Sequence, residues 1–113
     1  MADEHQPVTP VRPVLVTLPA EVDTVNADSI YKEITAEFAR GARIVIADMS
    51  GTAFCDTMAT RTLIRAHRRA VASGNELRLV MPAPWVIQAW RYLGADAVLP
   101  LYRSVADALA APG

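Results

Sequence analysis

Short apolar runs alternate with longer amphipathic stretches along most of this chain. Apolar runs at residues 14–18, 44–48 and 77–81 are rich in β-branched residues and leucine and are bounded by polar residues or proline. Such runs are typical of strands that are buried on both faces. A shorter apolar run at 97–99, directly before Pro100, predicts a last strand.

The stretches between and after these runs carry apolar residues at helical spacing. Helices are predicted over 26–40 and from residue 57 to about 72, with Asp56 before the second as its capping residue. A third helix is predicted over about 84–93. Its start is marked by Pro84, because proline suits the first turn of a helix. A fourth should follow Ser104, whose side chain can cap it.

Strands and helices therefore alternate along the sequence, which predicts an α/β fold. We expect a mostly parallel sheet of four to five strands with right-handed crossovers and about four helices. The chain is long enough for one domain, which we place at residues 14–113, with residues 20–23 as a turn. Residues 1–13 contain three prolines and are predicted to form a flexible N-terminal arm or a weak edge strand.

The composition is that of a compact globular domain with little net charge. The chain has 113 residues, 52% of them hydrophobic, and a formal net charge of −1. This balance gives no reason to expect nucleic acid as a partner. No apolar run approaches the roughly 20 residues that cross a bilayer. The acidic start does not resemble a secretory signal, and the lone cysteine suits a reducing compartment. We expect a cytoplasmic domain without membrane insertion.

Candidate chemistry should lie where the second strand passes into the second helix, at Asp48, Asp56 and Thr57, because sites in open α/β sheets form beyond the carboxyl ends of strands. The sequence has no glycine-rich phosphate loop and no cysteine and histidine cluster with metal spacing. Cys55 follows Phe54 in an apolar setting and is predicted to be a core residue. We therefore predict no catalytic residue, no metal and no cofactor, and do not expect an enzyme.

A phosphate-accepting receiver domain is a second interpretation of Asp48. That chemistry needs an acidic pair after the first strand and a lysine after the last. Residues 18–20, Leu-Pro-Ala, stand in place of the pair, and the only lysine is Lys32. The receiver interpretation fails on these residues, and Asp48 is expected to tie the strand end to the following loop.

The Asp56-Thr57 pair has two interpretations. In the structural one, Asp56 only caps the helix. In the functional one, Thr57 is a regulated hydroxyl, and a phosphate there would meet backbone N–H groups at the helix start and could be reached by Arg61. Asp56 and Asp48 would repel such a phosphate, which could disrupt a partner surface packed against the helix start.

The second helix also carries several arginines on its predicted outer side. This side is either a solvated helix face or a docking face for an acidic partner. Trp85 and Tyr92, on the outer side of the third helix, are further candidates for an exposed contact, although Trp85 could equally pack beside Pro84. The four arginines are Arg61, Arg65, Arg68 and Arg69.

Three segments, in order, resemble the STAS domain, specifically the bacterial anti-sigma-factor antagonist (anti-anti-sigma factor) family. Residues 20–23, Ala-Glu-Val-Asp, resemble a G-E-L-D-like turn. Residues 48–59, DMSGTAFCDTMA, resemble a D-L-S-x-x-x-F-x-D-S-S-G-like segment, and residues 93–102 resemble the family's end. The resemblance covers nearly everything from Val14 to Ala110.

This resemblance implies a non-enzymatic regulator that binds an anti-sigma factor of the serine/threonine kinase type. Thr57 falls on the hydroxyl residue that the kinase phosphorylates, and a PP2C-type phosphatase resets it. Met58-Ala59 replaces the family's Ser-Gly pair, so a non-phosphorylated STAS scaffold or a transporter-accessory module stays open as the alternative, as does association into a dimer. The residues expected to bind the partner are Asp23, Asp48, Ser50, Asp56, Thr57, Met58, Arg61 and Arg65.

Overall fold

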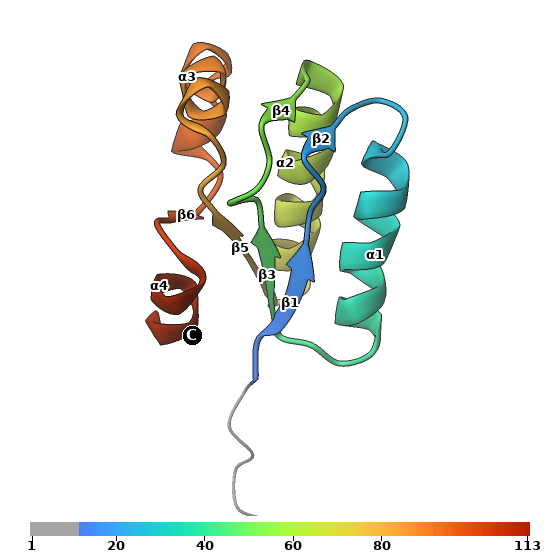
Figure 1. The fold of residues 1–113 in the computed structure, drawn as a ribbon. Helices are drawn as coiled ribbons and strands as arrows, with labels where there is room; N and C mark the ends of the chain where they lie inside the picture. Colours follow the sequence, from blue (N-terminus) through green and yellow to red (C-terminus); the bar gives the residue numbers. More distant parts are fainter. Residues whose placement is uncertain (1–11) are drawn as a thin grey trace, which may run out of the picture.

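A four-stranded parallel sheet forms the centre of the computed structural model, which describes residues 12–113 (Figure 1). The strand order is β1 (Val14–Thr17), β3 (Ile44–Asp48), β5 (Glu76–Val80) and β6 (Leu101–Tyr102). Each neighbouring pair is parallel. The alternation of strands and helices therefore predicted the α/β class and the mostly parallel sheet correctly.

Helices cover both faces of this sheet. On one face lie α1 (Ala27–Ala39) and α2 (Thr57–Ala72), and on the other lies α4 (Val105–Ala110). Figure 1 shows α3 (Pro84–Leu93) at the end of the sheet where the short strands β2 and β4 lie. None of the helices within residues 12–113 is long and apolar enough to cross a bilayer.

The two faces of β3 show why helices must cover the sheet on both sides. Val45 and Ala47 point into the large core under α1 and α2, whereas Ile44 and Ile46 pack in a smaller cluster with Ala108 of α4. Because neighbouring residues of a strand point to opposite faces, the unbroken apolar run of β3 requires apolar cover on each.

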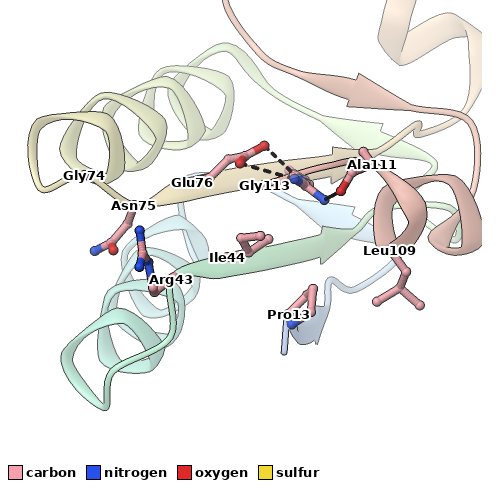
Figure 2. Close-up of a pocket in the computed structure, with 10 residues that line it drawn as sticks. Pro13, Arg43, Ile44, Gly74, Asn75, Glu76, Leu109, Ala111 and Gly113 are labelled. Carbon is pink, nitrogen blue, oxygen red and sulfur yellow. Dashed lines mark hydrogen bonds and ion pairs between the residues drawn. The ribbon is translucent and has the colours of Figure 1, made fainter. Parts of the chain in front are cut away.

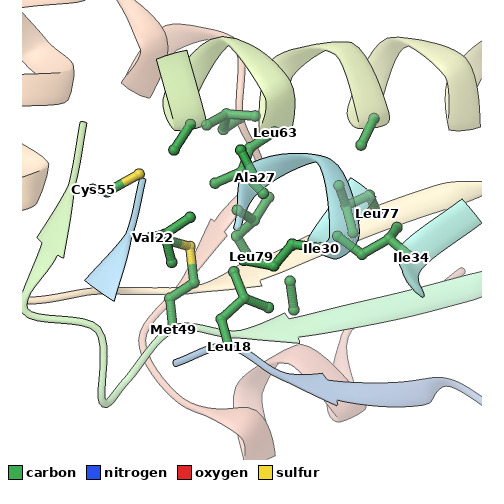
Figure 3. Packing of buried hydrophobic residues seen from close by; sticks show 14 of the residues in the cluster. Leu18, Val22, Ala27, Ile30, Ile34, Met49, Cys55, Leu63, Leu77 and Leu79 are labelled. Carbon is green, nitrogen blue, oxygen red and sulfur yellow. The ribbon is translucent and has the colours of Figure 1, made fainter. Parts of the chain in front are cut away.

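The large core is built from aliphatic side chains of the sheet and small residues of α2. Figure 3 shows Ile34 of α1 and Leu63 of α2 facing Leu77 and Leu79 of β5. One stripe of α2 is buried against the sheet, and its small residues let the helix lie close to it. The members of this stripe are Ala59, Leu63, Ala66 and Ala70.

The predicted strand at 97–99 is wrong. A short 3-10 helix, η1 (Ala95–Ala97), follows Gly94, which ends α3 in the left-handed conformation at φ 74°. Leu99 is buried in the core, and the strand β6 begins only after Pro100, whose carbonyl accepts a hydrogen bond from the Leu79 N–H at 3.0 Å. An apolar run this short does not distinguish a strand from a buried turn. Leu93, the last residue of α3, is 50% exposed.

The predicted turn at 20–23 contains a strand. Residues Glu21–Val22 form β2, which pairs in parallel with β4 (Phe54–Cys55) to make a separate two-stranded sheet. Two-residue strands show no periodicity, so the sequence pattern could not reveal them. The predicted N-terminal arm or weak edge strand at 1–13 lies, for residues 1–11, outside the described residues.

A fully buried arginine fastens the C-terminal segment to β5. The Arg78 side chain is 0% exposed, and its guanidinium forms an ion pair with Glu76 at 2.7 Å. Its Nη1 donates to the carbonyls of Ala108 at 2.6 Å and Ala111 at 2.9 Å, and its Nη2 donates to Pro112 at 2.8 Å. With the two bonds to Glu76, all five guanidinium N–H donors are used.

Replacement of Arg78 should therefore destabilise the domain strongly. We expect Arg78→Ala to lower the free energy of unfolding by about 3–5 kcal/mol, because it removes a buried charge partner and leaves buried carbonyls without donors. Urea denaturation followed by circular dichroism measures this change. The exposed Arg43 provides the control, since Arg43→Ala should change stability by no more than about 0.5 kcal/mol. Equal effects of the two substitutions would contradict the assigned role.

Candidate functional site

The start of α2 lies just beyond the carboxyl ends of the central strands. Asp56 is its N-cap in an extended conformation, and its Oδ1 accepts the backbone N–H of Ala59 at 2.8 Å. Thr57 is the first helical residue and is exposed. The cap that the sequence predicted is confirmed, and it leaves the neighbouring hydroxyl at the surface.

The second carboxylate oxygen of Asp56 joins α2 to the turn before α1. Asp56 Oδ2 accepts the backbone N–H of Thr24 at 3.1 Å and the Thr24 hydroxyl at 3.2 Å. The neighbouring Asp23 accepts the backbone N–H groups of Val25 at 2.9 Å and Asn26 at 3.2 Å. The structure therefore brings the segments around Asp23 and Asp56 together, although they are far apart in sequence.

Asp48 and Ser50 form a separate local unit at the end of β3. Asp48 Oδ1 accepts the Ser50 backbone N–H at 3.0 Å and its hydroxyl at 2.7 Å. This is the tie between strand and loop that the sequence predicted. Within residues 12–113 no hydrogen bond connects this unit directly to Asp56 or Thr57.

Exposed apolar side chains surround the start of α2. Phe54 is 51% exposed, Met58 52% and Trp85 62%. The Trp85 indole N–H donates to the carbonyl of Ala53, which ties the start of α3 to the loop before β4. Trp85 and Tyr92 are exposed, as predicted. Phe54 was not predicted as a site residue, because the two-residue strand β4 shows no periodicity; in the structure β4 buries Cys55 and exposes Phe54.

A buried threonine, which was not predicted as a site residue, holds the same loop in place. Thr52 is fully buried, and its hydroxyl donates to the carbonyl of Pro19 at 2.9 Å. The carbonyl of Thr52 in turn accepts the backbone N–H of Ala83 at 3.1 Å, just before α3. One residue thus links the loops that follow β1, β3 and β5.

Cys55 is a buried core residue, as predicted. Burial raises the pKa of its thiol, and the hydrogen bond with Thr60 opposes that effect only in part. The Thr60 hydroxyl lies 3.5 Å from Cys55 Sγ and accepts the Trp90 indole N–H at 2.9 Å. In the part of the chain that the structure describes, no three of the histidine, cysteine and acidic side chains are grouped to hold a metal ion.

Two predicted partner-binding residues, Arg61 and Arg65, are exposed on the outer side of α2. The Arg65 guanidinium lies 4.3 Å from the centroid of the Tyr31 ring of α1. Arg61 is one turn after Thr57, and on a helix residues four apart lie on the same face. Both arginines therefore extend the surface that begins at Thr57.

A hollow of about 470 Å³ lies at the opposite end of the sheet, near the first residues of β3 and β5 (Figure 2). Figure 2 shows Arg43, Glu76 and Leu109 around it. Arg78 also lines this hollow, but its five donors are all used within the domain. No residue from the start of α2 lines this hollow.

The fold and the surface at the carboxyl ends of the strands define a class of protein. It is a small parallel α/β domain in which a helix start and exposed apolar side chains lie beyond the strand ends. Residues 2–108 match the STAS domain family, and the chain belongs to that family. STAS domains are generally non-catalytic. No curated protein matches the sequence.

Solved structures share the fold at low sequence identity. The anti-sigma factor antagonist SpoIIAA in its unphosphorylated form is 18% identical, with a TM-score of 0.71 over 91% of this chain and 89% of that one. SpoIIAA, described as a Bacillus cell fate determinant, is also similar in its phosphorylated form, with a TM-score of 0.64. An anti-sigma factor antagonist from Mycobacterium paratuberculosis is 23% identical, with a TM-score of 0.73 over 84% and 80% of the two chains.

A transporter relative shares the fold equally well. A sulfate transporter family protein from Wolinella succinogenes is 17% identical, with a TM-score of 0.77 over 92% of this chain and 87% of that one. At these identities the likeness establishes the fold, which antagonists and transporter proteins have in common.

Substitution of Asp56 should separate its two roles. Asp56→Ala removes both the cap of α2 and the tie to Thr24, so we expect a loss of about 1–2 kcal/mol in the free energy of unfolding. Asp56→Ser retains a capping oxygen but loses the second acceptor and should have an intermediate effect. Urea denaturation measures both losses. Equal losses would show that the cap does not contribute, and a serine variant as stable as wild type would show that the Thr24 bonds do not contribute.

Alkylation should show that Cys55 is protected. With the domain folded, we expect its reaction with iodoacetamide near neutral pH to be at least about tenfold slower than in denaturant. Because burial raises the pKa of the thiol, the rate should keep rising to a higher pH than that of an ordinary cysteine. Intact mass follows the single site directly. Rapid labelling of the folded protein at neutral pH would contradict the burial.

Proposed function

We propose that the domain is an anti-sigma-factor antagonist, a non-enzymatic cytoplasmic regulator that binds a kinase-type anti-sigma factor and is switched by phosphorylation of Thr57. The supporting observation is the exposure and the hydrogen bonding of the Thr57 hydroxyl. It is exposed and makes no hydrogen bond within residues 12–113. The neighbouring Thr60 and Thr62 hydroxyls both donate to backbone carbonyls, at 2.9 Å and 3.0 Å.

The helix start provides the electrostatic setting for such a switch. Asp56 already caps α2 through the Ala59 N–H, so Thr57 is not needed as a cap. A phosphate on Thr57 would lie at the positive end of the helix dipole and within reach of Arg61. It would also face the carboxylate of Asp56, which repels it. The domain would tolerate the modification, whereas a partner packed against the helix start would meet new negative charge.

Met58 and Ala59, which replace the Ser-Gly pair of the family pattern, lie on different sides of the helix. Ala59 is fully buried in the core, so its methyl group takes no space from a partner. Met58 is half exposed and adds apolar surface beside Thr57. Thr57 itself is exposed. A relative of the same fold, SpoIIAA, is described in both unphosphorylated and phosphorylated forms, which is consistent with a switch of this kind.

A cognate anti-sigma kinase with ATP should add one phosphoryl group to the protein. We expect Thr57→Ala to abolish the addition, and Thr62→Ala, on the same helix, to leave it unchanged because its hydroxyl is bonded to the Met58 carbonyl. Intact mass measures the stoichiometry. A PP2C-type phosphatase should then remove the group. Phosphorylation of the Thr57→Ala variant, or none on the wild type, would contradict the switch.

The similarity to the Wolinella succinogenes sulfate transporter family protein supports a second candidate, a transporter-accessory module without phosphorylation. Affinity capture with the wild-type domain distinguishes the two. Recovery of an anti-sigma kinase supports the antagonist, and recovery of a transporter without a kinase supports the accessory role.

A further inference from the structure

We propose that the outer side of α2 is a docking surface for an acidic amphipathic helix of the protein partner. This surface, called the arginine face below, consists of Arg61, Arg65, Arg68 and Arg69. This inference adds to the proposed function the chemistry of the partner surface that would contact Thr57. It rests on the proposed function only for that link to Thr57.

The arginine face continues directly from Thr57. With about 100° of rotation per residue, Thr57, Arg61 and Arg68 lie on one stripe of α2, with Arg65 and Arg69 beside it. All of these residues are exposed. From Arg61 to Arg69 the surface extends about 12 Å along the helix axis. A partner helix of a few turns that contacts these arginines would end beside the Thr57 hydroxyl.

The charge of this surface is not neutralised within the domain. Within residues 12–113 none of the four arginines forms an ion pair with an acidic side chain, and α2 contains no acidic residue. The whole chain has a net charge of −1, and four of its eleven lysines and arginines are on this one helix face. A concentrated positive surface on a slightly acidic protein is complementary to an acidic partner.

Tyr31 of α1 holds two of these arginines in place. The Arg65 guanidinium stacks over the Tyr31 ring at 4.3 Å, and Arg69 Nη1 donates to the Tyr31 hydroxyl at 3.4 Å. Restraint of a long side chain before binding reduces the entropy lost on association. The arginines nearest α1 are therefore oriented before a partner arrives.

A hollow in the arginine face favours an amphipathic rather than a uniformly acidic partner. A hollow of about 470 Å³ is lined by Ile64 together with Arg61, Arg65 and Arg68. The surface of this hollow is largely apolar. Because arginines lay their aliphatic stems along apolar surface and keep the guanidinium in water, we expect the guanidinium groups at the rim. An aliphatic side chain fits the centre, and carboxylates one turn away on the same helix reach the rim.

Membranes and nucleic acids fit this surface less well. Helices that lie in a membrane surface bury an apolar face in the lipid, but the apolar face of α2 is packed against the sheet. The net charge of −1 also lacks the general basic character typical of nucleic-acid-binding domains.

The arginine face also explains how phosphorylation of Thr57 would release the partner. In that step the Thr57 hydroxyl oxygen forms a bond to the γ-phosphorus of ATP, ADP leaves, and the hydroxyl proton passes to the kinase. The new group carries a charge of about −1.5 to −2 and lies one turn from Arg61. It therefore competes with partner carboxylates for Arg61 and repels them.

The test uses a synthetic helical peptide in which leucines at helical spacing are flanked by glutamates. We expect amide shifts of the ¹⁵N-labelled domain to change along the outer side of α2. Arg65→Glu/Arg68→Glu should weaken the affinity, measured by fluorescence anisotropy, by about tenfold or more. The control is Arg43→Glu/Arg103→Glu, which changes the same charge at exposed arginines elsewhere and should bind like wild type.

Three results would overturn the docking surface: equal binding by Arg65→Glu/Arg68→Glu, shifts confined to another face, or equal binding of a peptide with lysines in place of the glutamates. Tighter, arginine-dependent binding of phosphatidylserine vesicles would instead assign the face to a membrane. Circular dichroism confirms that each variant is folded.

The two proposals fail separately. If the peptide binds the arginine face but the kinase does not phosphorylate Thr57, the docking surface stands and the switch is lost. If Thr57 is phosphorylated and the peptide does not bind, the switch stands and the docking surface is lost. Phosphorylated protein should bind the peptide several-fold more weakly than unmodified protein, and equal affinity would refute the release mechanism.

Discussion

Strand β3 has no side that faces water, and this constraint determines most of the architecture. Val45 and Ala47 require apolar cover on one face, and Ile44 and Ile46 require it on the other. Helices must therefore pack on both faces, and the short connections between strands and helices make the strands parallel. The cover is unequal, because α1 and α2 make a large core while α4 makes a small one. The Arg78 network fastens the smaller side.

The parallel arrangement also determines where a partner can approach. All the loops that follow the carboxyl ends of the strands meet at one edge, and polar contacts there link elements that are distant in sequence. Asp56 joins α2 to Thr24, and Thr52 joins the loops after β1, β3 and β5. These contacts restrain the surroundings of Thr57, while its own hydroxyl makes no hydrogen bond within residues 12–113. An exposed hydroxyl that makes no hydrogen bond within the described residues, surrounded by well-ordered loops, is suited to recognition by another protein.

Local signals predicted the large elements and the cap of α2 correctly. The alternation of apolar runs and helical periodicity identified the central strands and the main helices, because each depends mainly on its own residues. The strand at 97–99 was misplaced, because three apolar residues fit a buried turn as well as a strand. Strands β2 and β4 were missed, because each has two residues and exists only through pairing with the other.

By itself, the sequence determined the α/β class, the position of Thr57 at a helix start, the burial of Cys55 and the row of arginines on α2. Each of these follows from spacing or from neighbours along the chain. Only the tertiary structure decided that Asp56 binds Thr24, that Arg78 holds the C-terminal segment, that Tyr31 orients Arg65 and Arg69, and that Phe54 and Trp85 border the same edge. These contacts join residues far apart in sequence, and no local pattern specifies which distant groups meet when the helices pack against the sheet.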